Sequence, residues 1–202
     1  MTKKARIAVL VSGGGTNLQA LMDAQDSGKL RSGEIVFVVS NNPTAFAISR
    51  ARRAGIETMV ITGAQKTFES ALESTLNRHE IDLIILAGFM KILSPAFIRR
   101  FEGRIINVHP SLIPSFCGEG FYGLRVHEAA LARGVKVTGA TVHIVNEIPD
   151  GGPILLQKAV EVRDDDPPET LQNRVMEQAE WILLPKAAEM MSVELAGKGV
   201  MR

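Results

Sequence analysis

The sequence predicts an α/β protein in which an open, mostly parallel sheet carries helices on both faces and is followed by a long C-terminal helix. Three observations support this fold class. Runs rich in aliphatic and β-branched residues alternate with segments of helical spacing. These runs are apolar almost throughout, as strands of a parallel sheet are when helices cover both faces. An apolar stripe at helical spacing occupies the C-terminal part of the chain.

Parallel strands are expected at residues 6–12, 34–40, 57–62, 82–88 and 104–109. Each run is followed by a helix-compatible segment, so right-handed crossovers should connect the strands. Near residue 136 the pattern changes to two extended runs, 136–145 and 154–162, joined by the turn-rich stretch NEIPDGG. We expect these two runs to extend the sheet beside the last parallel strand.

The C-terminal helix has clear start signals. Asp166 is predicted to cap it, with Pro167 at the first helical position and Glu169 three residues after the cap. The apolar stripe that should pack on the sheet consists of Leu171, Val175, Ala179, Ile182 and Leu183.

The composition is typical of one globular domain, expected to span residues 1–202, with 46% hydrophobic and 22% charged residues. Lysine and arginine number 23 against 22 acidic residues and aromatic residues make up 5%, so nucleic acid is not an expected partner. The single cysteine, Cys117, excludes an internal disulfide framework and favours a cytoplasmic location. The N-terminal apolar run IAVLV is too short for a secretory signal or a bilayer span, so no membrane partner is expected.

The turn SGGGTNLQ, residues 12–19, joins the first predicted strand to the first predicted helix. Its glycines allow backbone amides to approach a ligand, and a helix N-terminus favours negative charge, so the turn suits a phosphate. It is neither a Walker loop nor a complete GxGxxG, because Leu18 stands where the last glycine belongs. The second strand ends in SNN rather than in an acid for a ribose diol, which argues against NAD. A single phosphate is the favoured ligand, and a plain connecting turn is the alternative.

The stretch RIINVHPSLIPSF carries two polar side chains at the end of a buried strand. Because side chains alternate along a strand, Asn107 and His109 should point to one side and Ile106 and Val108 to the other. In open α/β sheets ligands bind beyond the carboxyl ends of the strands, where the glycine turn also lies. An imidazole can act as acid or base near neutral pH, and an amide can donate to an oxyanion. The pair therefore suits acyl transfer.

A carboxylate for this pair is available in the turn IPDGGP. Asp150 in that turn can reach the same edge of the sheet, since the two glycines after it permit a tight backbone. His143 on the preceding run is either a partner of the pair or a packed residue, and we favour the latter. His79 and His127 lie in helical patterns and are expected at the surface. No spacing of His, Asp or Glu predicts a metal site.

The stretches SGGGTNLQA, LAGFMKILSP, INVHPSLIPSF and GATVHIVNEIPDGGPILLQ occur in this order over essentially the whole chain. Together they resemble the phosphoribosylglycinamide formyltransferase family. The resemblance implies a Rossmann-like formyltransferase fold and transfer of the formyl group of the cosubstrate 10-formyltetrahydrofolate to the amine of phosphoribosylglycinamide, in purine biosynthesis, without a metal. It also implies a phosphate-binding half, 1–100, and a catalytic and folate-binding half, 101–202.

The resemblance assigns roles to individual residues. The catalytic residues would be Asn107, His109 and Asp150, with Asp150 favouring the imidazolium form of His109. The substrate-binding residues would be Gly15, Thr16 and Asn17 for the phosphate and Glu180 for the ribose hydroxyls. The folate-binding residues would be Gln65, Met90, Lys91, Ile92, Leu93 and Asn107.

Two features depart from the family pattern. Gln65 stands where the family usually has an arginine at the edge of the folate site, and Lys66 beside it could supply the charge. The loop 116–124 is longer and richer in glycine than the usual form, so it either closes over the substrate or is a variable surface turn. A nucleophilic role for Cys117 is not expected, because formyl transfer from folate to an amine needs no covalent intermediate.

Other functions remain open at this point. A formyltetrahydrofolate hydrolase or another formyltransferase of the same superfamily would share the Asn-x-His and Asp elements. A non-enzymatic nucleotide-binding module would keep the glycine turn but would have no use for Asn107, His109 and Asp150 together. The sequence is compatible with a monomer and with a homodimer.

Overall fold

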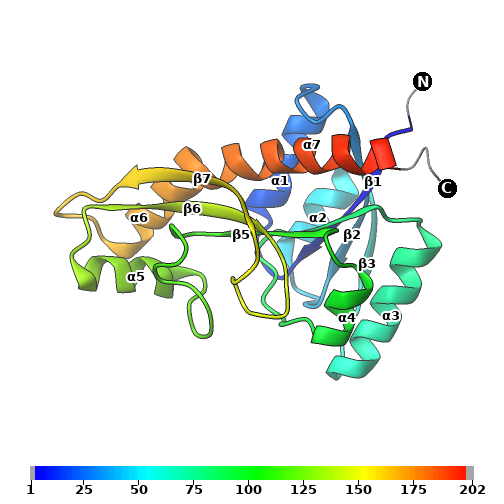
Figure 1. Cartoon of the computed structure of the whole chain (residues 1–202), viewed down its shortest axis with the longest axis horizontal. Helices are drawn as coiled ribbons and strands as arrows, with labels where there is room; N and C mark the ends of the chain where they lie inside the picture. Colours follow the sequence, from blue (N-terminus) through cyan, green and yellow to red (C-terminus); the bar gives the residue numbers. More distant parts are fainter. Residues whose placement is uncertain (1–2, 199–202) are drawn as a thin grey trace.

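The computed structural model describes residues 3–198 and contains a seven-stranded sheet in the order β3-β2-β1-β4-β5-β6-β7 (Figure 1). The strands are β1 (Ala5–Val11), β2 (Gly33–Ser40), β3 (Glu57–Val60), β4 (Leu83–Leu86), β5 (Ile105–His109), β6 (Val137–Ile144) and β7 (Ile154–Glu161). The helices are α1 (Thr16–Asp26), α2 (Phe46–Arg53), α3 (Gln65–Arg78), α4 (Pro95–Arg100), α5 (Leu124–Arg133), α6 (Pro168–Val175) and α7 (Trp181–Lys198), with a π turn, η1 (Met176–Glu180), between the last two. Within residues 3–198 no helix has the length and apolar character needed to cross a membrane.

The sheet confirms the predicted fold class. β1 pairs in parallel with β2 and β4, β2 pairs in parallel with β3, and β4 with β5. β6 and β7 are antiparallel and extend the sheet beyond β5. Each run that we expected to be a strand overlaps one strand of the sheet, with bounds that differ by at most two residues, so the apolar patterning located the strands correctly.

Apolar side chains build a separate core on each face of the sheet. In β1, Ile7 and Val9 belong to the core under α1, α2, α6 and α7. Ala8 and Leu10 belong to the core under α3 and α4. All of these side chains are fully buried. A strand between two cores has no solvent-facing side, which explains the unbroken apolar runs.

The winding of the chain reverses between β1 and β4. The chain proceeds outward from β1 to β3, and β4 then returns to pair with the other side of β1. At such a reversal the crossover helices diverge to opposite faces, and a crevice opens beyond the carboxyl ends of the two strands. The glycine turn leaves β1 at this crevice and residues 87–94 leave β4 there. The expected ligand site therefore lies at the switch point of the sheet.

The start of the C-terminal helix differs from the prediction by one residue. Helical residues begin at Pro168, and Pro167 occupies the N-cap position. Asp166 does not cap the helix, because its carboxylate accepts a hydrogen bond from the backbone N–H of Arg163 (2.8 Å) and pairs with the guanidinium of Arg174.

The π turn η1 changes which residues of the C-terminal helix are buried. A π turn holds one residue more than an α turn, so the buried stripe moves on by one position after it. Leu171, Val175, Ala179 and Leu183 are buried as expected, but Ile182 is 47% exposed. The prediction for Ile182 was wrong because it assumed an uninterrupted helix.

Gly33, at the start of β2, lets α7 lie close against the sheet. A Cβ atom at this position would lie 2.4 Å from Oγ of Ser192 in α7 and 2.5 Å from Cδ1 of Ile7 in β1. Both neighbours are fully buried, so neither side chain can move aside freely.

We expect Gly33→Ala to lower the free energy of unfolding by roughly 1–3 kcal/mol, because the added methyl group overpacks this contact. Gly197→Ala is the matched control, since a Cβ atom there meets nothing within 4 Å. Urea unfolding of both variants measures the difference. A Gly33→Ala protein as stable as the wild type would contradict the close packing of α7.

Candidate active site

A cavity of about 1000 Å³, here called the main cavity, lies beyond the carboxyl ends of the central strands. Among the predicted site residues, those that line it are Gly15, Thr16, Asn17, Met90, Lys91, Ile92, Leu93, Asn107, His109, Asp150 and Glu180. Gln65 is not part of the lining. Its Nε2 donates to the carbonyl oxygen of Ile92 (2.7 Å), and Ile92 does line the cavity. Among residues 3–198, no group of three or more His, Cys, Asp or Glu side chains is placed to hold a metal ion.

β5 presents its two polar residues on one side, as its alternating pattern predicts. Ile106 and Val108 pack into the core under α1 and α7. Asn107 and His109 therefore leave the strand on the opposite side. In the antiparallel neighbour β6, His143 pairs with Asn107, so this imidazole joins the same side of the sheet.

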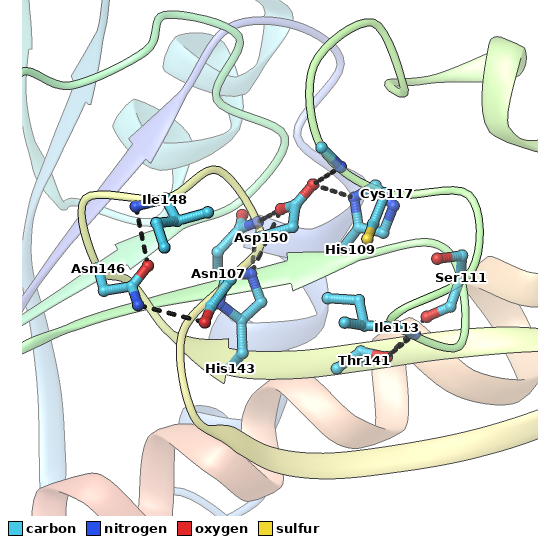
Figure 2. A network of polar contacts seen from close by, with 12 residues as sticks. Asn107, His109, Ser111, Ile113, Cys117, Thr141, His143, Asn146, Ile148 and Asp150 are labelled. Atoms are coloured by element: carbon cyan, nitrogen blue, oxygen red, sulfur yellow. Dashed lines mark hydrogen bonds and ion pairs between the residues drawn. The ribbon is translucent and has the colours of Figure 1, made fainter.

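Asp150 reaches the pair from the turn between β6 and β7 (Figure 2). Its backbone is left-handed, with φ of 54°, a conformation that aspartate tolerates better than most residues. Asn146 shapes the turn, because its Oδ1 accepts from the N–H of Ile148 (3.0 Å) and its Nδ2 donates to the carbonyl of Gly151 (3.2 Å). This turn directs the Asp150 carboxylate to the end of β5.

The Asp150 carboxylate contacts both β5 residues. Its Oδ2 lies 3.4 Å from Nδ1 of His109 and accepts from the backbone N–H of Gly118 (2.9 Å). Its Oδ1 lies 3.4 Å from Nδ2 of Asn107 and 3.4 Å from Nε2 of His143. Burial alone would raise the pKa of this carboxyl, but the hydrogen bond from His143, the nearby His109 and the Gly118 N–H outweigh burial and lower the pKa. Asp150 is therefore ionised near neutral pH.

The imidazole of His109 lies between two acceptors. Its Nε2 is 2.8 Å from the carbonyl oxygen of Phe116, and because a carbonyl can only accept, Nε2 carries a hydrogen. Its Nδ1 faces the Asp150 carboxylate. Burial lowers the pKa of His109 and outweighs the Asp150 carboxylate, which raises it. Asp150 thus favours the imidazolium as expected, but burial has the larger effect on the pKa of His109.

Asn107 lines the main cavity and contacts both His143 and Asp150. Its Nδ2, Nε2 of His143 and Oδ1 of Asp150 form a nearly equilateral triangle with sides of 3.3, 3.4 and 3.4 Å. A carboxylate oxygen can only accept, so the Asn107 amide donates a hydrogen bond to Asp150.

The structure corrects the expectations for three histidines. His143 is packed as expected, at 2% exposed, but it also belongs to the polar cluster. His127 in α5, expected at the surface, is fully buried, lines the main cavity and has a pKa lowered to about 4 by burial and by the nearby His109. The side chain of His79, also expected at the surface, is only 15% exposed, and its ring packs on Phe37 with centroids 4.2 Å apart. Helical spacing did not reveal which face of these short helices is covered.

The loop 116–123 meets the cluster from the cavity side. Phe116, with a positive φ of 49°, directs its carbonyl at His109, and Gly118 directs its N–H at Asp150. Cys117 lies between these two contacts, and burial together with the Asp150 charge raises the pKa of its thiol. A raised pKa disfavours the thiolate, which is the reactive form.

Where the glycine turn lines the main cavity, its backbone amides point away from α2. The carbonyls of Gly13 and Gly14 accept hydrogen bonds from the N–H of Ala47 (3.1 Å) and from Nε of Arg50 (2.9 Å). In a trans peptide the next N–H points opposite to the carbonyl, so the amides of Gly14 and Gly15 point away from α2. Gly15 is left-handed, with φ of 75°, and a Cβ atom there would lie 2.6 Å from Cβ of Ala47, so this position requires glycine.

Asn17 and Glu180 form a buried pair beside the glycine turn. Nδ2 of Asn17 donates to Oε2 of Glu180 (2.7 Å), and Oδ1 of Asn17 is buried with no hydrogen-bond partner among the described residues. Burial raises the pKa of the Glu180 carboxyl to about 7, although the hydrogen bond from Asn17 lowers it. Glu180 belongs to the π turn η1, which our sequence reading missed. Such turns are frequent at functional sites, where the extra residue redirects a side chain.

The cavity wall after β4, residues 88–94, is held by α3. Nε2 of Gln65 donates both to the carbonyl of Ile92 (2.7 Å) and to Oε1 of Glu69 (2.5 Å). The Glu69 carboxylate in turn accepts from the backbone N–H and the hydroxyl of Ser94, each at 2.6 Å. The amide of Gln65 is therefore engaged in shaping the wall.

Comparison with known proteins identifies the family. The formyl transferase family matches residues 5–187. The chain belongs to the formyl transferase family. The resemblance inferred from the motifs is thereby confirmed.

The most similar proteins extend this result. The trifunctional purine biosynthetic protein adenosine-3 of Gallus gallus is 44% identical over 195 residues, which make up 95% of this chain and 19% of that protein, so the chain spans about a fifth of this relative. The crystal structure of glycinamide ribonucleotide transformylase 1 from Symbiobacterium toebii has a TM-score of 0.88 at 37% identity, covering 95% of this chain and 89% of that chain. A formyltetrahydrofolate deformylase from Burkholderia mallei has a TM-score of 0.83 at 29% identity, covering 96% of this chain and 66% of that chain.

The buried Glu180 should make folding stability depend on pH. Its pKa is about 7 in the folded protein against 4.5 for an ordinary glutamate, so the unfolded chain loses this proton first as pH rises. Stability should therefore fall between pH 4.5 and 7, by at most about 3 kcal/mol. Glu180→Gln should abolish this fall, as measured by urea unfolding across the window.

Glu177→Gln is the matched control, because Glu177 lies in the same π turn but is exposed. Its stability should follow the pH dependence of the wild type. If the Glu180→Gln curve also runs parallel to the wild type, Glu180 is not protonated by burial.

Proposed function

We propose that the protein is a phosphoribosylglycinamide formyltransferase. It transfers the formyl group of 10-formyltetrahydrofolate to the amine of 5-phosphoribosylglycinamide, giving formylglycinamide ribonucleotide and tetrahydrofolate in de novo purine biosynthesis. The observation that carries the proposal is that one cavity joins the glycine turn, the cluster around Asp150 and an exposed apolar wall. A phosphate-bearing amine and a folate-type formyl donor need these parts together. Family membership and the likeness to a solved glycinamide ribonucleotide transformylase support the same function.

The glycine turn supplies the phosphate site in this proposal. α1 begins at Thr16 with no side-chain cap and no acidic residue in its first turn. The first amides of a helix have no partner within it and lie at the positive end of its dipole. Gly15, Thr16 and Asn17 would bind the phosphate through these amides, since the Asn17 side chain is bonded to Glu180. Glu180, oriented by Asn17, would contact the ribose hydroxyls.

Asn107, His109 and Asp150 carry the transfer. As the amine attacks the formyl carbon, negative charge develops on the formyl oxygen, and the Nδ2 amide of Asn107 and Nε2–H of His109 are the donors for it. In this structure the Phe116 carbonyl accepts a hydrogen bond from that Nε2–H. The carbonyl must therefore move away before the formyl oxygen can take its place. Asp150 faces Nδ1 of His109 and stabilises the imidazolium there while protons move from the amine to the departing folate nitrogen.

The wall after β4 would receive the folate. Met90 and Ile92 are 50% and 68% exposed, on either side of Lys91, and offer an apolar edge to the pterin ring. Leu93 is 5% exposed and supports the wall from behind. Gln65 would act by holding the Ile92 carbonyl, and the exposed Lys66 would supply the charge that the family's arginine provides.

The hydrolase of the same superfamily is the second candidate, because a solved deformylase shares the fold. The cluster of Asn107, His109 and Asp150 serves either reaction, with water in place of the amine. The glycine turn favours the transferase, because a hydrolase has no phosphate-bearing acceptor to bind. A non-enzymatic module would leave the buried polar cluster without a purpose.

The chain's organisation and location follow as part of the proposal. The half formed by residues 1–100 would bind the phosphate and the half formed by residues 101–202 would carry catalysis and much of the folate site. A cytoplasmic location, small molecules as the only partners, and a monomer or homodimer stay predictions from composition.

Loss of the cluster should lower turnover without unfolding the protein. We expect His109→Ala and Asp150→Asn each to reduce the turnover number by roughly 10² to 10⁴, the range of acid-base contributions. Because Asp150 acts through His109, the double variant should lose less than the product of the two factors. Steady-state assays of formyl transfer measure this. His79→Ala, outside the main cavity, is the control, and fully multiplicative losses would mean that the two residues act independently.

The acceptor phosphate should be essential for efficient catalysis. Several charge-assisted hydrogen bonds to the glycine turn are lost together in glycinamide riboside, so kcat/KM should fall at least about a hundredfold relative to the ribonucleotide. Inorganic phosphate should compete with the ribonucleotide and not with the folate. A riboside that reacts as well as the ribonucleotide would make the turn a mere connector and would reopen the choice of acceptor.

A further inference from the structure

Ser12 bridges the two sides of the crevice at the switch point. Its hydroxyl donates to Oδ1 of Asn41 after β2 (2.6 Å) and accepts from the backbone N–H of Met90 after β4 (2.8 Å). Its own N–H donates to the carbonyl of Gly88 (3.1 Å), and its carbonyl accepts from Nδ2 of Asn42 (3.1 Å). Ser12 is only 8% exposed, so these bonds are shielded from water. One residue thus holds the ends of three strands.

The hydroxyl of Ser12 joins two parts of the main cavity that would bind different ligands. Ser12 is the first residue of the glycine turn, and Met90 is the first exposed apolar residue of the wall after β4. The wall has other side-chain anchors, but Gln65 and Glu69 belong to α3 and bond to the wall and to each other rather than to the glycine turn. The Ser12 hydroxyl is the side-chain anchor that ties the wall to the turn.

The direction of the hydrogen bonds shows why a hydroxyl is needed. The Met90 N–H can only donate, so the Ser12 oxygen must accept from it, and the hydroxyl hydrogen is left for Oδ1 of Asn41. Alanine at this position would remove both bonds and leave the Met90 N–H without its partner. Threonine would keep the donor and the acceptor.

We propose that Ser12 is a positioning residue that couples the two subsites: a phosphate on the glycine turn and a folate on the wall after β4 each raise the affinity for the other. A bound phosphate restrains the turn, and the Ser12 hydroxyl passes that restraint to the backbone of Met90. The second ligand then meets a wall that is already ordered. By linkage, the factor is the same in both directions. This inference rests on the proposed function, since it assumes a phosphate-bearing acceptor and a folate.

Calorimetry of the wild-type protein tests the coupling. The dissociation constant of phosphoribosylglycinamide is measured alone and with saturating tetrahydrofolate, which carries no formyl group and cannot react. We expect tetrahydrofolate to lower the dissociation constant of the ribonucleotide by a factor of roughly 5 to 150. Ser12→Ala should bring this factor to within about twofold of unity, and Ser12→Thr should restore it.

Gln65→Ala is the matched control, because it releases the same wall at Ile92 without touching the turn. It should weaken tetrahydrofolate binding and keep the coupling factor. A general loosening of the wall would instead lower the factor in both variants, which would contradict the role assigned to Ser12.

Hydrogen exchange of the wild-type protein provides a test that does not depend on folding of the Ser12→Ala variant. Inorganic phosphate should slow exchange of the Met90 amide, because it restrains the Ser12 hydroxyl that binds this N–H. Unchanged Met90 exchange, or full coupling in Ser12→Ala, would overturn the inference while the proposed function stands. Failure of the wild type to bind either ligand would overturn the proposed function itself.

Discussion

The reversal of winding between β1 and β4 is the constraint on which the rest of the site depends. Since the crossover helices diverge there, no helix covers the carboxyl ends of these two strands. The exposed ends must be closed by loops, and the glycine turn and residues 88–94 do so, tied together through Ser12. The antiparallel addition of β6 and β7 then places the Asp150 turn over the neighbouring strand β5. Four separate pieces of chain thus meet at one place for topological reasons.

Burial and charge act against each other in the main cavity, and the balance differs from group to group. Burial drives His109, His127 and Glu180 toward their neutral forms, because little water remains to solvate a charge. Asp150 is the exception, since the hydrogen bond from His143, the nearby His109 and the Gly118 N–H together outweigh burial and lower the pKa of its carboxyl. The cavity therefore holds an ionised carboxylate close to groups that burial shifts toward their neutral forms, an arrangement that suits a site where protons must move between groups.

The sequence predicted more of the site than of its surroundings. Asn107 and His109 were placed correctly because alternation along a strand is a local property of the backbone. The contact of His143 with the cluster and the burial of His127 were not predicted, because they depend on the register of β5 against β6 and on the docking of α5, which involve distant parts of the chain. Ile182 was misplaced for a related reason: the π turn before it is a deviation of one residue that no periodic pattern announces.

The sequence by itself determined the strands, the presence of helices on both faces of the sheet and the candidate catalytic and binding residues. It could do so because apolar periodicity, glycine and short polar motifs act over a few neighbouring residues. It also indicated that the glycines of the turn allow close backbone approach, and the structure adds that Gly15 has a left-handed backbone. Only the tertiary structure decided which groups carry charge and which segments are coupled. The lowered pKa of His109, the raised pKa of Glu180 and the bridge from Ser12 to Met90 all arise between residues far apart in the chain. Desolvation and hydrogen-bond geometry depend on everything that packs around a group, and that surrounding exists only once the chain has folded.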